Sequence, residues 1–94
     1  MNKRKIIYSV LTEINKGAAD LKAVDYGLSE ETFGDLVETI QDEGLIKGAT
    51  FFKSKGKILI TFLNAAKVTI KGIDYLEENS VLSKIDKDLK EASK

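Results

Sequence analysis

The spacing of the apolar residues changes at Gly44, and this change limits the folds that the chain can adopt. Before Gly44, apolar residues recur every three or four positions, as they do on one face of a helix. After Gly44, they form short runs separated by a stretch rich in lysine and glycine, which is typical of strands joined by a turn. The chain therefore combines helices with a small amount of sheet.

Two helices are predicted before Gly44. The first ends near Gly17, where glycine is a common helix stop. Its apolar stripe consists of Ile6, Ile7, Val10, Leu11 and Ile14. The second covers residues 29–43, with Ser29 as its N-cap and two acidic residues in its first turn, where the helix dipole favours negative charge. The stripe of this second helix consists of Phe33, Leu36, Val37 and Ile40.

A β-hairpin is predicted directly after the second helix. Residues 45–46 and 51–52 have strand character, and residues 58–62 form the returning strand. Between them, residues 53–57 read Lys-Ser-Lys-Gly-Lys, which predicts a five-residue turn. Phe51 and Phe52 alternate along a strand, so we expect one of them in the core and the other exposed.

The segments on either side of these elements are shorter. Residues 18–28 predict a short turn and an extended segment that ends at Gly27, with Leu21, Val24 and Tyr26 as core contacts. After the returning strand, residues 63–67 lead out of the hairpin through a possible bulge.

Two more helices are predicted towards the end of the chain. Thr69 caps a helix from Ile70 to about Asn79, in which Ile73 and Leu76 face inward. Tyr75 is expected in the core as well. A final amphipathic helix is predicted over about residues 81–93. Its apolar stripe consists of Val81, Leu82, Ile85, Leu89 and Ala92.

The order helix, short segment, helix, hairpin, helix is that of the winged helix-turn-helix. We therefore predict an α+β protein with one β-hairpin wing and an extra C-terminal helix. Residues 1–94 form a single domain, with a core over about residues 3–79 and the last helix over about residues 81–93. By analogy with other winged-helix proteins, that last helix is expected to pack on the domain or to pair with a second copy.

Two local motifs support this fold. Residues 42–46, Asp-Glu-Gly-Leu-Ile, look like the exit from the third helix of many winged-helix proteins. Residues 68–76, Val-Thr-Ile-Lys-Gly-Ile-Asp-Tyr-Leu, resemble the segment that follows the wing, in which Thr caps a helix and Gly allows close packing. Over nearly its full length the chain resembles the YjcQ family, small proteins of bacteria and of their phages and prophages. This resemblance implies the fold and an association with phages or prophages, but the family carries no settled biochemical role.

The composition argues against catalysis. The chain has no histidine and no cysteine, and thus lacks the usual general base, the usual activated nucleophile and the commonest transition-metal ligands. No phosphate-binding glycine loop or calcium-loop pattern occurs. We expect no enzyme activity, no cofactor and no metal; a small carboxylate-dependent enzyme is the remaining catalytic alternative. No apolar run is long enough to span a membrane and no secretory signal is present, so a cytoplasmic location is expected.

The charges separate along the chain although the 15 basic and 15 acidic residues balance. Residues 29–43 contain six acidic residues and no basic one, whereas residues 44–68 contain five lysines and no acidic residue. An acidic helix would be repelled by DNA in the usual major-groove docking mode, and only Gln41 and the threonines there could contact a base edge. The candidate partner-binding surface on this helix comprises Glu31, Asp35, Glu38 and Asp42. The candidate phosphate contacts in the wing are Lys53, Lys55 and Lys57.

These charges favour a non-enzymatic protein that makes macromolecular contacts, with a protein partner or self-association preferred over DNA. An acidic surface on one molecule and a basic one on another suit head-to-tail assembly. The alternative is a DNA-binding regulator that contacts phosphates through its lysine-rich wing, with weak and salt-sensitive affinity. Two plainer interpretations also stay open. The acidic residues can be a solvated helix face, and lysines on edge strands discourage aggregation.

Overall fold

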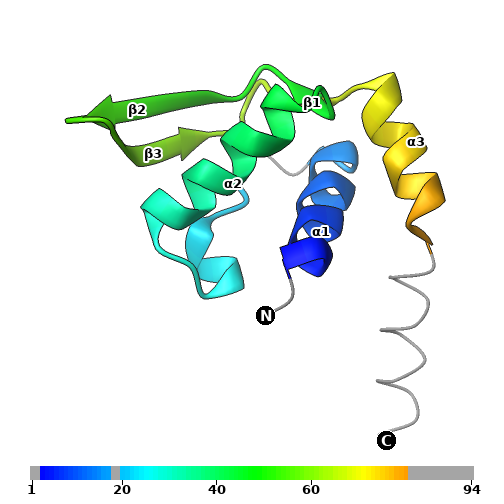
Figure 1. The fold of residues 1–94 in the computed structure, drawn as a ribbon, viewed down its shortest axis with the longest axis horizontal. Coiled ribbons are helices and arrows are strands. Elements are labelled where there is room, and N and C mark those ends of the chain that lie inside the picture. The colour runs from blue at the N-terminus through cyan, green and yellow to red at the C-terminus, as the bar shows by residue number, and fades with distance from the viewer. Residues whose placement is uncertain (1–2, 18–19, 81–94) are drawn as a thin grey trace, which may run out of the picture.

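A computed structural model describes residues 3–17 and 20–80 of the chain, which form an α+β fold of helices and short antiparallel strands (Figure 1). The helix predicted over about residues 81–93 lies outside these residues. The helical elements are α1 (Lys3–Asn15), the 3₁₀ turn η1 (Ala23–Tyr26), α2 (Glu30–Asp42) and α3 (Ile70–Glu78). The strands are β1 (Ile46–Lys47), β2 (Thr50–Ser54), β3 (Lys57–Phe62) and β4 (Lys67–Val68).

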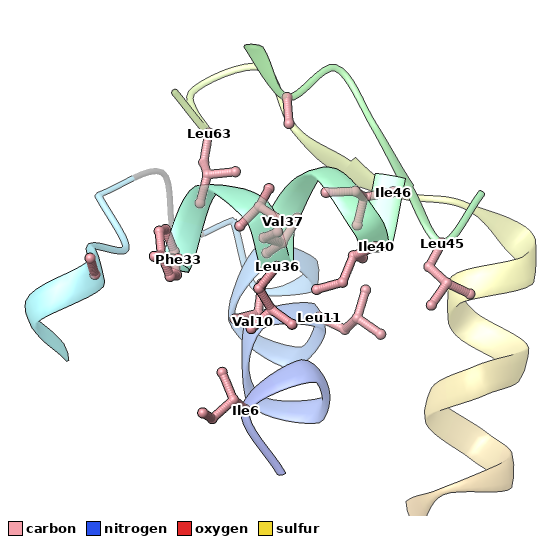
Figure 2. Close-up of a cluster of buried hydrophobic side chains, with 13 residues drawn as sticks. Ile6, Val10, Leu11, Phe33, Leu36, Val37, Ile40, Leu45, Ile46 and Leu63 are labelled. Carbon is pink, nitrogen blue, oxygen red and sulfur yellow. The ribbon is translucent and has the colours of Figure 1, made fainter. Parts of the chain in front are cut away.

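The core lies where the apolar stripes of α1 and α2 meet. Figure 2 shows Val10 and Leu11 of α1 beside Leu36 and Ile40 of α2. The predicted stripes are confirmed: the buried residues of α1 are Ile6, Val10, Leu11 and Ile14, and those of α2 are Phe33, Gly34, Leu36, Val37 and Ile40. The predicted cap is confirmed too, because the Ser29 hydroxyl accepts a hydrogen bond from the backbone N–H of Thr32 at 3.1 Å.

Among the described residues between α1 and α2, the chain makes the 3₁₀ turn η1, and Gly27 is its C-cap. A turn was predicted here, but the extended segment expected to end at Gly27 does not form, because the turn itself continues to that glycine. Leu21 and Tyr26 pack against the core, and the Tyr26 ring stacks on Phe33 with 6.1 Å between the ring centroids. Val24, which we expected in the core, is 75% exposed. Ala23 is buried instead, because in so short a turn adjacent side chains point in different directions and only one of the two can face the core.

The strands form two small antiparallel pairs. Strand β1 pairs with β4, with Ile46 opposite Val68, and β2 pairs with β3, with Thr50 opposite Phe62. The β2–β3 pair projects beyond the helices and lies over α2 (Figure 1).

The hairpin turn is shorter than predicted. Strand β2 continues through Lys53 to Ser54, which pairs with Lys57, so Lys55 and Gly56 alone form the turn. Both have positive φ, 52° and 80°, which is the geometry of the tight turn whose twist matches that of the two strands. The prediction of a five-residue turn was therefore wrong, because Lys53 and Ser54 have no side chain that would end a strand.

Helix α3 begins as predicted. Thr69 is its N-cap and accepts a hydrogen bond from Gly72 N–H at 3.1 Å, and its hydroxyl donates to the Gly44 carbonyl at 2.5 Å. Gly72 is buried, and Leu76 packs partly buried against the core. Ile73, which was predicted to face inward, is 41% exposed, since Tyr75 and not Ile73 lies on the side of the helix that contacts the core.

Candidate interaction surfaces

The acidic residues of α2 predicted as a partner surface lie in one row along the helix. Their spacing of three or four residues places them on the same side. Glu31, Asp35 and Asp42 are exposed, while Glu38 is half-buried. We call these four residues the acidic row. The row is thus a continuous feature of the surface of α2.

One wing lysine contacts this row within the same chain. Lys53 Nζ donates a hydrogen bond to Glu38 Oε2 at 2.7 Å. The hydrogen bond to Glu38 is the main cause that raises the pKa of Lys53 above its usual 10.5, and the negative charge of Glu38 adds to it. The charges of Asp42 and Asp35 contribute in the same direction. Part of the acidic row is therefore compensated by the β2–β3 hairpin of its own molecule, a contact that was not predicted from the sequence.

The other two candidate phosphate contacts stand apart from the row. Lys55 is in the hairpin turn and Lys57 is the first residue of β3, and both are exposed. The structure thus brings Lys53 together with Glu38 but leaves Lys55 and Lys57 at the hairpin tip.

The polar side chains of α2 that could contact a base edge have partners inside the protein. The Gln41 amide accepts a hydrogen bond from Ala49 N–H at 2.8 Å and donates one to the Ala49 carbonyl at 3.0 Å. Thr39 donates to the Asp35 carbonyl at 2.9 Å. Gln41 therefore acts as a structural link between α2 and the base of the hairpin.

The two faces of the β2–β3 hairpin differ. On the inner face, Phe51 pairs with Thr61 and Lys53 pairs with Ile58. Ile58 is 2% exposed and lies against Gly34, where an added Cβ would collide with its side chain. A helix can approach this strand so closely only because position 34 has no side chain. Helix α2 thus covers the inner face.

The outer face carries apolar residues that no described residue covers. Because residues opposite each other in a ladder point to the same side, Thr50, Phe52, Ile60 and Phe62 share this face. A bulge between Phe52 and Lys53 leaves Leu59 as the extra residue of β3, beside them. Phe52, Leu59, Ile60 and Phe62 are between 44% and 54% exposed. We call these four residues the outer patch.

The sequence analysis missed three of the four residues of the outer patch. It predicted correctly that one of Phe51 and Phe52 is exposed, since Phe52 is 54% exposed while Phe51 packs partly buried on the core. Leu59, Ile60 and Phe62 were assigned only to a returning strand. Residues 58–62 are apolar except for Thr61, and a hairpin that packs against one helix buries only one of its faces. This pattern could have indicated that some of these apolar residues are exposed.

Surface hollows bring few carboxylates together. A hollow of about 380 Å³ between α1 and α2 contains Asp35, and one of about 270 Å³ between α1, α2 and α3 contains Glu43, each as its single acidic residue. Among residues 3–17 and 20–80, no group of three or more potential ligand side chains is placed to hold a metal ion. No helix in the described part of the chain has the length and apolar content required to cross a membrane.

Comparisons with known proteins agree with each other. A family model described as YjcQ protein matches residues 5–94. The Uncharacterized protein YjcQ of Bacillus subtilis (strain 168) is 35% identical over 91 residues, which cover 97% of this chain and 94% of that protein. The solution NMR structure of the YjcQ protein from Bacillus subtilis superposes with a TM-score of 0.59 and 31% identity, over 80% of this chain and 92% of the other. The chain belongs to the YjcQ family.

Proposed function

We propose that the chain is a winged-helix protein without catalytic activity, whose function is to bind another protein. The order α1, η1, α2, hairpin, α3 supports the winged-helix assignment, with α2 as its third helical element and β2–β3 as its wing. An association with a phage or prophage is part of this proposal. Its support is the resemblance to the YjcQ family.

The outer patch is the observation that carries the proposal. Phe52, Ile60 and Phe62 form neighbouring cross-strand positions, and Leu59 extends them. Soluble proteins rarely keep contiguous apolar surface without a use for it, and the buried centres of protein interfaces are rich in aromatic and aliphatic side chains. A surface of this kind suits a protein partner better than a nucleic acid, which needs positive charge and hydrogen-bond donors.

The electrostatics of α2 support the same preference. In the usual docking mode of winged-helix proteins, the third helical element, here α2, enters the major groove. The acidic row would then lie close to the DNA phosphates, and the repulsion between these negative charges would oppose binding. Lys53 is held by Glu38, and Gln41 is held by Ala49, so neither is available for DNA without giving up a contact inside the protein.

Affinity purification with the full chain tests the proposal. We expect Ile60→Asp to lose a partner that the wild-type chain retains, because a charge at the centre of an apolar contact must be desolvated. Asp74→Asn is the matched control, since Asp74 is exposed on α3 and belongs to neither the outer patch nor the acidic row. A partner retained equally by Ile60→Asp and wild type, both folded by circular dichroism, contradicts binding through the outer patch.

DNA binding is the second candidate, favoured by one observation. Lys55 and Lys57 are exposed at the hairpin tip, in a stretch from residue 44 to residue 68 that has no acidic residue. Fluorescence anisotropy with random duplex, at low and at physiological salt, distinguishes the two candidates. Binding that survives physiological salt and is lost in Lys55→Glu/Lys57→Glu would favour DNA; binding seen only at low salt is what we expect.

A further inference from the structure

We infer that the outer patch binds residues 81–94 of a second copy of this chain, so that two copies exchange their C-terminal segments. This inference rests on the proposed function, because it names the protein partner of the outer patch. Three features carry it: the shape of the patch, the pattern of the segment, and the place where α3 ends.

The outer patch is suited to an amphipathic helix. On the inner face, β3 already packs against α2, which approaches closely at Gly34. On the outer face, Ile60 and Phe62 of β3 lie opposite Phe52 and Thr50 of β2, which gives an apolar row two strands wide. A helix that packs there would complete three layers, helix, hairpin and helix, as helices commonly pack on both faces of a sheet.

The C-terminal segment has the pattern that such a surface requires. Its apolar residues recur at helical spacing, and the stripe consists of Val81, Leu82, Ile85, Leu89 and Ala92. A helix of this length extends about 21 Å, whereas residues 59–62 of a strand extend only about 13 Å, so the stripe is long enough to cover the patch.

One carboxylate accompanies the apolar stripe. Asp88 is three residues after Ile85 and four before Ala92, which places it beside the stripe on a helical projection. The charged residues of the hairpin are all lysines, and Lys55 and Lys57 are exposed at its tip. Residues 81–94 contain four lysines and three acidic residues, so a contact between Asp88 and these lysines would orient the segment on the patch and does not select it as the partner.

The position of α3 points to a second copy as the source of the segment. The described residues measure 45 Å along their longest dimension, and Figure 1 shows the hairpin tip and α3 at its two ends. Ser80 follows α3 almost directly, so a helix of about 21 Å would have to reverse its direction at once to reach its own hairpin. In an exchange the segment is not confined to its own hairpin, and two copies make two equal contacts related by twofold symmetry.

The mass of the full chain in solution tests this inference. By sedimentation equilibrium we expect twice the 10.4 kDa mass of one chain. Ile60→Asp, which damages the patch, and Leu89→Asp, which damages the segment, should each weaken the dimer at least about tenfold. Circular dichroism checks that both variants fold, and Asp74→Asn, an exposed position on α3, serves as a surface control that leaves the dimer intact.

Mixing the two variants separates exchange from other modes of pairing. Ile60→Asp retains an intact segment and Leu89→Asp retains an intact patch, so their mixture should form a mixed dimer through one good contact, although neither variant dimerises alone. A dimer that survives Leu89→Asp would indicate pairing of two hairpins, and one that survives Ile60→Asp would indicate pairing of two segments. Either result overturns the inference.

The charge contact provides an independent check. Asp88→Lys should weaken the dimer, more at low than at high salt, and adding Lys55→Glu and Lys57→Glu in the same chain should restore part of the loss. A wild-type chain that is monomeric overturns the inference, but it leaves the proposed function standing if Ile60→Asp still loses a partner in affinity purification. If Ile60→Asp changes neither the mass nor the partners, both proposals fail.

Discussion

The two faces of the β2–β3 hairpin share a ladder, and the outer face has the larger number of apolar residues, yet α2 covers only the inner face. The inner face has Ile58, which is buried against Gly34 of α2, and Lys53, which donates a hydrogen bond to Glu38. The outer face has Phe52 and Ile60, each about half exposed. The difference shows that an apolar residue in a strand is buried only if a neighbouring element has a shape that fits it.

Replacing one isoleucine on each face gives the largest contrast. Ile58→Ala should lower the free energy of unfolding by about 2–5 kcal/mol, because it leaves a cavity under α2. At concentrations at which the chain is monomeric, Ile60→Ala should lower it by about 1 kcal/mol or less, since water already reaches half of this side chain. Urea unfolding of both variants measures the contrast. Equal losses at the two positions would mean that the outer patch is covered within the folded monomer.

Filling the close contact between α2 and β3 sharpens the comparison. Gly34→Ala should destabilise the protein by about 1–2 kcal/mol, because overpacking against Ile58 outweighs the helix propensity gained. The double variant Gly34→Ala/Ile58→Ala should lose less unfolding free energy than the two single variants together, since the shorter side chain at position 58 makes room for the new methyl group. Strict additivity in urea unfolding would disprove the contact.

Two threonines provide a smaller contrast in the opposite direction. The Thr61 hydroxyl on the inner face is buried, and the structure gives it no hydrogen-bond partner. Thr61→Val should therefore raise the unfolding free energy, by about 1 kcal/mol, because it removes an unsatisfied polar group. Thr50→Val on the exposed outer face should change it by less than about 0.5 kcal/mol. A loss of stability in Thr61→Val would indicate that its hydroxyl has a partner in solution.

The smallest expected effect concerns pH. The pKa of Lys53 is raised above 10.5, chiefly by its hydrogen bond to Glu38. Its contribution to stability is thus fully present below pH 10.5, the value of the unfolded chain, and is lost as the pH rises through the folded pKa. At alkaline pH the unfolding temperature should therefore fall as Lys53 loses its proton. Glu38→Gln should make this fall smaller, whereas Lys55→Gln should leave it unchanged. An identical decline in wild type and Glu38→Gln would contradict a Lys53–Glu38 contact in solution.

The helices were the most predictable part of the fold. The stripes that contain Val10 and Val37, together with the caps Ser29 and Thr69, place α1, α2 and α3 because helical spacing and capping are local properties of the sequence. The mistakes at Val24 and Ile73 share one cause. In short elements the direction of a side chain depends on the packing of neighbouring elements, which a local pattern does not contain.

The candidate site was predictable only in part. The acidic row followed from spacing alone, but its contact with Lys53 depends on where the hairpin lies over α2. The outer patch depends on a bulge at Leu59, which shifts the register so that Ile60 and Phe62 face outward while Ile58 faces α2. Such a shift arises from the pairing of two strands and is not visible in either strand alone.

The link between Gln41 and Ala49 has a further consequence for binding. Its two hydrogen bonds join the last turn of α2 to the backbone of Ala49, just before β2, so a swing of this backbone away from the helix would break both. A surface patch on a freely moving arm loses conformational entropy when a partner immobilises it. Here that ordering has already taken place on folding, so the face that we propose for binding is held in place before a partner arrives, in part by one amide side chain.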